Sequence, residues 1–321
     1  MSQLKYDADY QKTFSVLLSK QRKPWSSVEE IKSSSCRSLE AFCLSYESTS
    51  TSGVSIKTIS VKSFDNVSID MYWTAPDSAI AASAPRAAVL YLHPGGHCAG
   101  SAKSFTHVNS RYARSTGLSF FAVEYRLAPE FPAPYGLEDA LAAFQHLAAH
   151  SAAFNIDPAR IIVMGDSSGG GMAAGLCLLI RDRNLPVRPV KQMLCEPMLD
   201  DCTVLPATSP LNSMLSWFPQ ENSMAWQALL GVRAGDPQVD VEPYYAPARA
   251  QDLTDLPPAY LDIGSLDLFV GETMEYAKRL SQAGVAVELH VWPGLPHMHD
   301  FYGIPTTTRT MGTRSTAMKK L

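Results

Sequence analysis

The chain has 321 residues, with 27 Lys and Arg against 31 Asp and Glu, so its formal net charge is −4. This weak acidity gives no electrostatic reason to bind nucleic acid or an anionic membrane. No apolar stretch reaches the roughly 20 residues that a membrane span needs, which excludes a membrane-spanning protein.

Apolar runs alternate with helical patterns from about residue 55 onward. This alternation predicts an α/β fold, a mostly parallel eight-stranded sheet with helices on both faces. The predicted strands, in chain order, are Val54–Val61, Val67–Trp73, Ala87–Leu92, Ser119–Val123, Ile161–Met164, Gln192–Cys195, Ala259–Ile263 and Val287–Trp292. Apolar residues at helical spacing predict helices over Leu137–Ala149 and Gly271–Ala283, and Gly284 is suited to end the second helix. No long polar linker divides the chain, so we expect a single domain over residues 1–321.

Two segments do not fit the alternation, residues 1–45 and the insert 200–250. In the first, the residues on one helical face are Tyr10, Phe14, Leu17 and Leu18. In the second, helical spacing relates Leu211, Met214, Leu215 and Phe218, with Trp217 beside them and Trp226, Leu229 and Leu230 beyond. Both segments either pack on the main domain or form a cap that makes an apolar pocket and excludes water. The Ser/Thr-rich stretch Ser45–Ser52 is expected to be a loop, and Thr306–Leu321 a solvated end.

The sequence Gly-Asp-Ser-Ser-Gly at residues 165–169 follows an apolar run and precedes a helix-compatible run of small residues. A strand that turns abruptly into a helix at a serine between glycines is typical of a nucleophile elbow. The glycines let the strand and the helix approach closely. The serine hydroxyl then lies at the positive end of the helix dipole. The pattern therefore predicts Ser167 as a nucleophile.

A serine hydroxyl needs a base to take its proton and a carboxylate to orient that base. In this architecture the chain order is serine, acid, histidine, and each partner follows a late strand. Asp267 follows the strand Ala259–Ile263, and His297 follows the strand Val287–Trp292. These two residues are therefore the predicted acid and base.

Four other residues compete for these roles. Asp262 falls within a strand, where a structural carboxylate is expected, and Glu272 falls where a helix begins, which favours a negative charge in any case. His299 is close enough to His297 to be a rival base, whereas His290 alternates within a strand.

A tetrahedral intermediate needs backbone N–H groups directed at its oxyanion. Gly95 and Gly96 follow the third predicted strand, upstream of the elbow, where esterases carry a glycine motif. Their amides are accessible because no side chain blocks the approach. Ser168, next after the nucleophile, would supply a third donor.

At this point the chain resembles the hormone-sensitive lipase family of α/β-hydrolases, from about Ala87 to Phe301. The resemblance is carried by His-Pro-Gly-Gly at residues 93–96, the stretch 124–134 with Asp139, the elbow, Gly-Ser-Leu-Asp at 264–267 and Pro-Gly-Leu-Pro-His at 293–297. It implies a carboxylic ester hydrolase with an N-terminal helical cap and without metal or cofactor.

The chain departs from the family pattern at three positions. Pro94 replaces the first glycine of the oxyanion motif, which removes one N–H. His97 stands where the family usually has an aromatic residue, followed by Cys98; it is either a polar part of the pocket wall or a hydrogen-bonding partner of the substrate. Met298 replaces a glycine that often follows the catalytic histidine, which keeps His299 in contention.

The sequence thus predicts a serine hydrolase acting on uncharged, largely apolar esters or lactones of small to medium size. The residues predicted to line its substrate pocket are His97, Leu211, Leu215, Trp217 and Phe218. A lactonase, a thioesterase or an acyltransferase would use the same three residues. A non-catalytic binding protein, like the plant gibberellin receptors that the family resembles, is disfavoured because serine, acid and histidine are all present. A homodimer is compatible with the sequence.

Six cysteines are scattered along the chain without a Cys-x-x-Cys pair: Cys36, Cys43, Cys98, Cys177, Cys195 and Cys202. This spacing indicates neither a zinc site nor a dense disulfide framework, so most are expected to be core residues in a reducing compartment. The first residues lack the apolar core of a signal peptide, which favours a cytoplasmic protein. The last three residues, Lys-Lys-Leu, resemble a peroxisomal signal only weakly, because its small residue is missing.

Overall fold

The computed structural model describes residues 4–18, 22–34, 53–301 and 304–321. The eight predicted strands form one sheet in the order β1-β2-β4-β3-β5-β6-β7-β8. Their bounds are β1 (Val54–Lys62), β2 (Ser68–Pro76), β3 (Arg86–Leu92), β4 (Ser119–Val123), β5 (Ile156–Asp166), β6 (Lys191–Cys195), β7 (Ala259–Gly264) and β8 (Val287–Trp292). β2 runs antiparallel to β1 and β4, and the remaining neighbours are parallel. The predicted fold class is therefore confirmed.

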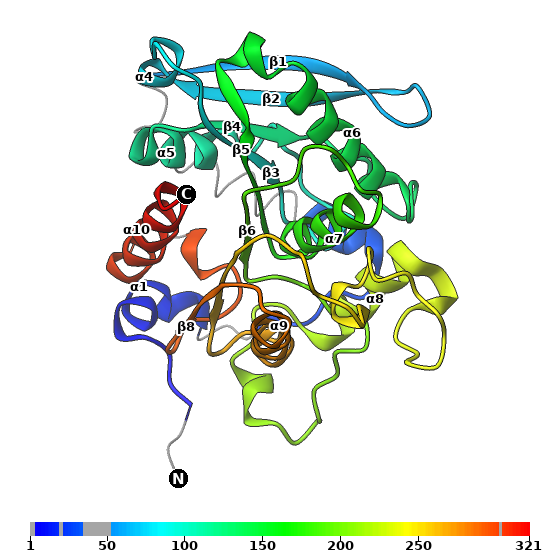
Figure 1. Cartoon of the computed structure of the whole chain (residues 1–321). Coiled ribbons are helices and arrows are strands. Elements are labelled where there is room, and N and C mark those ends of the chain that lie inside the picture. Colours follow the sequence, from blue (N-terminus) through cyan, green and yellow to red (C-terminus); the bar gives the residue numbers. More distant parts are fainter. Residues whose placement is uncertain (1–3, 19–21, 35–52, 302–303) are drawn as a thin grey trace.

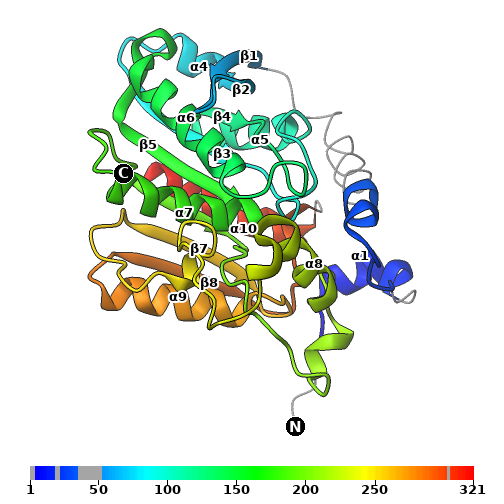
Figure 2. The same cartoon turned by 90° about the vertical axis from the view of Figure 1, so that its right-hand side faces the viewer.

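Helices cover both faces of this sheet (Figures 1 and 2). The α-helix bounds are α1 (Ala8–Leu18), α4 (Asp77–Ile80), α5 (Thr106–Thr116), α6 (Tyr135–Ala149), α7 (Ser168–Asp182), α8 (Pro219–Leu230), α9 (Val270–Gln282) and α10 (Pro305–Lys319). α5 and α10 pack on one face, and α6, α7 and α9 pack on the other. None of the helices in the described ranges combines the length and apolarity that crossing a bilayer requires.

Strand β3 shows why the apolar runs of the sequence are nearly continuous. Successive side chains of a strand point to opposite faces. Leu90 packs toward α6 and α7, whereas its neighbour Tyr91 packs toward α5 and α10, and both are fully buried. Because helices cover both faces, both sets of side chains are apolar or aromatic. The C-terminal ends of β5, β7 and β8 meet at one edge of the sheet, where the loops that follow them converge.

The prediction that Thr306–Leu321 is a solvated end was wrong, because this segment forms α10. Pro305 opens the helix, and Thr307 Oγ1 accepts a hydrogen bond from the backbone N–H of Ile304. One face of α10 is buried, through Thr307, Thr310, Met311, Arg314, Ser315, Ala317 and Met318. Much of that face is polar, so the apolar spacing used for prediction could not reveal it.

The predicted helical spacing over Leu211–Phe218 was also wrong. A 3₁₀ turn covers Pro210–Ser213, and α8 begins only at Pro219. Phe218 is extended (φ −100°, ψ 154°), because the ring of the following proline disfavours a helical backbone at the preceding residue. The buried aromatic and leucine side chains of the insert therefore lie mostly on α8, which contributes Trp226, Leu229 and Leu230.

The N-terminal segments pack at two different places. Tyr10 of α1 lies in a cluster with Trp292, Leu295 and Ile304. Residues 22–34 instead pack on the insert: Ile31 lies in a buried cluster with Trp226. Residues 35–45 of the predicted cap, with Cys36 and Cys43, and the predicted loop Ser45–Ser52 lie outside the described residues, as does the side chain of Leu17.

Candidate active site

The turn between β5 and α7 holds Ser167 in an unusual backbone conformation, with φ 55° and ψ −121°. A positive φ at a non-glycine residue costs about 1–3 kcal/mol and persists only where the surroundings impose it. Here the Ser167 N–H donates to the carbonyl of Cys195 (2.9 Å). The Ser167 carbonyl accepts from the N–H groups of Gly171 and Met198 (3.0 Å each). The chain on both sides of the serine thus fixes the turn.

Two glycines of the elbow are required by close backbone contacts. A Cβ at Gly165 would lie 2.1 Å from the carbonyl oxygen of Gly169. A Cβ at Gly169 would lie 2.2 Å from the carbonyl oxygen of Leu92 on the neighbouring strand β3. Both distances are far below van der Waals contact, so only glycine fits at either position.

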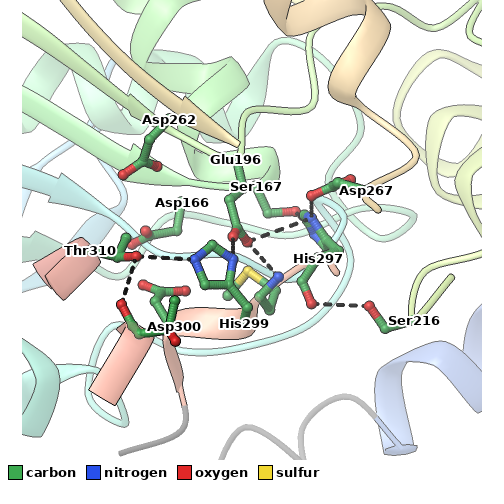
Figure 3. A network of polar contacts seen from close by, with 12 residues as sticks. Asp166, Ser167, Glu196, Ser216, Asp262, Asp267, His297, His299, Asp300 and Thr310 are labelled. Atoms are coloured by element: carbon green, nitrogen blue, oxygen red, sulfur yellow. Dashed lines mark hydrogen bonds and ion pairs between the residues drawn. The ribbon is translucent and has the colours of Figure 1, made fainter. Parts of the chain in front are cut away.

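The structure brings Ser167, Asp267 and His297 together in one hydrogen-bonded row (Figure 3). Nε2 of His297 lies 2.9 Å from Oγ of Ser167, and Nδ1 of the same ring lies 2.7 Å from Oδ2 of Asp267. Asp267 is held in turn by the N–H of Phe269, which donates to Oδ1 (2.9 Å). All three functional side chains are buried, with 6% exposure for Ser167 and 8% for His297.

The four competing residues lie in other interactions. Asp262 binds Arg314, and Glu272 accepts hydrogen bonds from the N–H groups of Leu199 and Asp200. His290 pairs with Glu288 (2.9 Å) on β8. His299 pairs with Glu196 through Nδ1, and its Nε2 lies 3.3 Å from Oγ1 of Thr310 on α10. Only Met298 separates His299 from His297, yet the two rings face different partners (Figure 3).

Glu196 is a neighbour of His297 that sequence reasoning missed. It follows β6 with a φ of 46° and is fully buried. Its Oε2 lies 3.8 Å from Nδ1 of His297 and accepts a hydrogen bond from the N–H of Met298. Its Oε1 pairs with His299. The signal available in the sequence was a carboxylate directly after a parallel strand, at the same sheet edge as the elbow.

Both histidines of this loop have raised pKa values. Burial lowers the pKa of His297, but the charge and hydrogen bond of Asp267, with a further contribution from Glu196, outweigh it and leave the pKa above 6.5. For His299, burial is likewise outweighed by the charge and hydrogen bond of Glu196. Glu196 itself has a pKa raised by burial, which His299 and His297 oppose.

Behind the elbow, the buried Arg314 of α10 contacts three carboxylates. Its guanidinium binds Asp262 through two hydrogen bonds (2.7 and 2.8 Å), pairs with Asp300, and lies 3.3 Å from Asp166. Asp166 directly precedes Ser167, and it also accepts a hydrogen bond from Tyr91 (2.6 Å). Burial raises the pKa of Asp166 to about 7 against the opposing charge of Arg314. The last helix therefore stabilises the strand that carries the serine.

The loop after β3 presents backbone N–H groups beside the elbow. Gly95 and Gly96 have φ values of 140° and 61°. A Cβ at Gly95 would lie 2.0 Å from the carbonyl oxygen of Ala99. No described residue accepts a hydrogen bond from the N–H groups of Gly95 or Gly96, and Ser168 is the first residue of α7, whose N–H has no partner within the helix.

His97 lies at the wall of a pocket next to this loop. It has a φ of 62° and is 4% exposed, and its ring centroid lies 5.5 Å from that of Trp226. The other residues that line the pocket are Tyr125, Arg126, Ala133, Pro134, Gly136, Leu137, Met172, Leu229, Tyr244 and Tyr245. Burial lowers the pKa of His97 to about 4.

The other residues predicted to line the pocket pack together beside it, in one apolar cluster with Trp226: Leu211, Leu215, Trp217 and Phe218. Of these, Trp217 approaches the loop of Gly95 and Gly96, because a Cβ at Gly96 would lie 3.1 Å from its ring. Ser216 is a contact that the sequence did not indicate: its Oγ donates to the backbone carbonyl of His297 (3.0 Å). The insert thus contacts both the loop of Gly95 and Gly96 and the loop of His297.

Two groups of side chains in the described ranges have the composition of metal ligands. Glu196, Asp267 and His297 have ligand atoms within 4.8 Å of one another, as do Asp200, Asp201 and Cys202. In the first group, Asp267 forms a hydrogen bond with His297. Glu196 pairs with His299 and accepts a hydrogen bond from the Met298 amide, so both carboxylates already have partners. In the second, Asp201 is bound by the guanidinium of Arg249 (2.6 and 2.7 Å).

Comparisons with known proteins identify the family to which the chain belongs. A family model described as the alpha/beta hydrolase fold matches residues 89–302. The chain is 34% identical to the esterase LipI of Mycobacterium tuberculosis over 243 residues, 74% of this chain and 73% of LipI. It is 32% identical to the ethyl acetate hydrolase of Pseudomonas putida over 218 residues, 66% of this chain and 65% of that protein, just under two thirds of its length. A solved bacterial heroin esterase matches with a TM-score of 0.87 and 31% identity over 98% of both chains.

Proposed function

The chain belongs to the hormone-sensitive lipase family of α/β-hydrolases, and from this premise we propose that it is a serine esterase with Ser167 as its nucleophile. The observation that carries the proposal is the row of hydrogen bonds from Ser167 through His297 to Asp267, at 2.9 and 2.7 Å. A base within hydrogen-bond reach of a serine, itself oriented by a carboxylate, is the arrangement that activates a hydroxyl.

In the proposed reaction, Nε2 of His297 takes the proton of Ser167 as the serine oxygen attacks the carbonyl carbon of the ester. The oxyanion that forms accepts hydrogen bonds from the N–H groups of Gly95, Gly96 and Ser168. His297 then gives its proton to the leaving alkoxide, and the acyl group stays on Ser167. A water molecule, deprotonated by the same ring, then attacks the acyl carbon. The bond between the acyl carbon and Oγ of Ser167 breaks, the carboxylic acid leaves, and His297 returns the proton to Oγ.

Asp267 holds His297 in the tautomer that leaves Nε2 free to accept the proton, because it accepts the hydrogen bond from Nδ1–H. Its negative charge also stabilises the imidazolium that forms during the attack. Before the reaction, the same interaction raises the pKa of His297.

We further propose uncharged, largely apolar esters of small to medium size as substrates, with residues 22–34 and the insert forming a cap over Ser167. Two features support this proposal. The walls near the oxyanion loop are mainly apolar and aromatic, including Met172, Leu229 and Trp217. Two relatives bear the names ethyl acetate hydrolase and esterase.

The test is the variant Ser167→Ala, assayed with p-nitrophenyl butyrate, together with labelling by a fluorophosphonate. Wild-type protein should release p-nitrophenol and become labelled, and Ser167→Ala should lose both properties while keeping its melting temperature. Ser223→Ala, which changes an exposed serine of α8, is the control and should behave as wild type. Persistent hydrolysis by Ser167→Ala would eliminate the proposed nucleophile, and absence of labelling in the wild type would favour a non-catalytic binding protein.

A further inference from the structure

His97 combines deep burial with two unsatisfied ring nitrogens. Its side chain belongs to the buried residues, yet neither Nδ1 nor Nε2 has a hydrogen-bond partner among the described residues. Leaving a buried polar group unpaired is destabilising, so such groups are rare in native proteins. A pocket-lining residue of this kind is expected to find its partner in a bound molecule.

Three other polar side chains that line the pocket have partners: those of Arg126, Tyr125 and Tyr244. The guanidinium of Arg126 binds Asp139 and Asp65. The hydroxyl of Tyr125 donates to the carbonyl of His93 (2.7 Å), and the hydroxyl of Tyr244 donates to Asp182 (3.0 Å). Among the described lining residues, buried polar atoms without a partner therefore belong to His97. The rest of the wall is apolar or aromatic.

The position of the pocket indicates which part of an ester it would hold. In the proposed reaction His297 protonates the leaving oxygen, so the alcohol part of the ester lies on the side of His297. The pocket is lined by residues of the segment 125–137, of α7 and α8, and of positions 244–245, and by none from the loops that carry Asp267 and His297. His97 directly follows Gly96, whose N–H group is a proposed donor to the oxyanion of the acyl carbon. The acyl chain is therefore the part directed into this pocket.

We propose that the pocket beside His97 receives the acyl chain, and that the His97 imidazole forms a hydrogen bond with an uncharged polar group, a hydroxyl or an amide, on that chain. This inference rests on the proposed function. It goes beyond it by assigning acyl specificity to a residue that replaces the aromatic side chain usual in the family.

The chemistry of the pocket favours a neutral ligand group. Burial holds the pKa of His97 at about 4, so the ring is neutral near pH 7 and offers one donor and one acceptor. A hydroxyl or an amide can satisfy either. A carboxylate would meet no unpaired cation among the described lining residues, because Arg126 is already bound to two carboxylates.

The experiment compares pairs of p-nitrophenyl esters that differ by a hydroxyl in place of a methyl group. The pairs are 3-hydroxybutyrate with 3-methylbutyrate, and 6-hydroxyhexanoate with heptanoate. For each pair, the quantity compared is kcat/KM of the hydroxyl ester divided by kcat/KM of the methyl ester. In at least one pair we expect this ratio to be about 10-fold higher for the wild type than for His97→Phe, in line with the effect of one uncharged hydrogen bond in a buried site.

Two further variants make the result decisive. His97→Gly also removes the imidazole, and glycine adopts the φ of 62° without strain, so it serves if His97→Phe does not fold. Leu229→Ala widens the same pocket without removing a hydrogen-bonding group, so it should change the rates for both esters of a pair and keep their ratio. Equal ratios in wild type and in the His97 variants would overturn the inference. Failure of every ester, without labelling of Ser167, would instead overturn the proposed function.

Discussion

Two carboxylates lie beside Nδ1 of His297, Asp267 at 2.7 Å and Glu196 at 3.8 Å. Both favour the protonated ring, and together they hold its pKa above 6.5 despite burial. A general base must be neutral to accept the proton of Ser167. The rate therefore falls as the pH drops through this raised pKa, and kcat/KM for a neutral ester should decline in acid with a midpoint above pH 6.5.

The variant Glu196→Gln tests the part played by the second carboxylate. Removing its negative charge destabilises the imidazolium, which lowers the pKa of His297, so the acid limb of kcat/KM should move to lower pH. Glu288→Gln is a matched control, because Glu288 also pairs with a histidine, His290, on β8. The pH profile of the control should coincide with that of the wild type. If the Glu196→Gln protein is folded and its acid limb is unchanged, Glu196 does not raise the pKa of His297.

Alanine variants of the two histidines decide which ring is the base. His297→Ala should reduce kcat by about 10⁴-fold or more, as loss of the base in a serine hydrolase does. His299→Ala should lose far less activity, since its ring contacts Glu196 and Thr310 rather than Ser167. Single-turnover kinetics with p-nitrophenyl acetate would measure both effects, and a greater loss in His299→Ala would reverse the assignment.

At this scale the sequence revealed Ser167, Asp267 and His297 because each follows a strand of the parallel sheet within a recognisable motif. Glu196 also follows a strand, yet a lone carboxylate after a strand has no motif around it. Its importance arises from the loop of His297 and His299 folding back over β6, which is a contact between distant parts of the chain.

Among the elements, α10 depends most on buried charge. Arg314 is fully buried, and its cationic group contacts Asp166, Asp262 and Asp300. Removing one member of a buried ionic group leaves its partners uncompensated, which destabilises a protein by about 3–5 kcal/mol. The last helix therefore contributes to the stability of the whole sheet edge.

The variant Arg314→Met should lower the free energy of unfolding by about 3–5 kcal/mol, measured by urea denaturation. Arg309→Ala changes an arginine on the exposed side of the same helix, where it lies over the ring of Trp292, and should cost less than about 1 kcal/mol. Similar losses for the two variants would contradict the role assigned to the buried cluster.

The strands could be predicted closely because their apolar runs are long and bounded by turn residues; β4 and β8 have the predicted bounds. α10 could not, because its buried face includes Thr307, Thr310 and Arg314, whose partners lie far away in the sequence. The prediction of helical spacing over residues 211–218 was wrong for a local reason, since Pro219 prevents a helix from running through Phe218.

On the scale of the whole molecule, residues 22–34 pack against the insert, about two hundred positions away in the chain. Arg22 donates two hydrogen bonds to Glu221 of α8 (2.6 and 2.8 Å), and the N–H of Trp25 donates to the same carboxylate (2.8 Å). The Glu221 side chain is fully buried, whereas that of Arg22 is 35% exposed. This carboxylate is the main polar link between residues 22–34 and the insert.

Arg22→Ala should weaken the docking of residues 22–34 by about 1–3 kcal/mol, because Glu221 loses its charged partner. We expect faster cleavage by chymotrypsin, for which Trp25 is a site that both variants keep, and a higher KM for p-nitrophenyl butyrate, with little change in the unfolding of the sheet. Lys32→Ala breaks the exposed ion pair of the same segment with Glu130 and should cost at most about 1 kcal/mol. Equal proteolysis of both variants would argue against this role of Glu221.

The cluster around Arg314 also bears on the order in which the protein matures during translation. Asp166, Asp262 and Asp300 all leave the ribosome before their shared counter-ion does. Until residue 314 emerges, these three carboxyl groups lack the cation that they share in the folded protein. We therefore expect the serine turn to reach its final conformation only after the C-terminal helix has joined the fold.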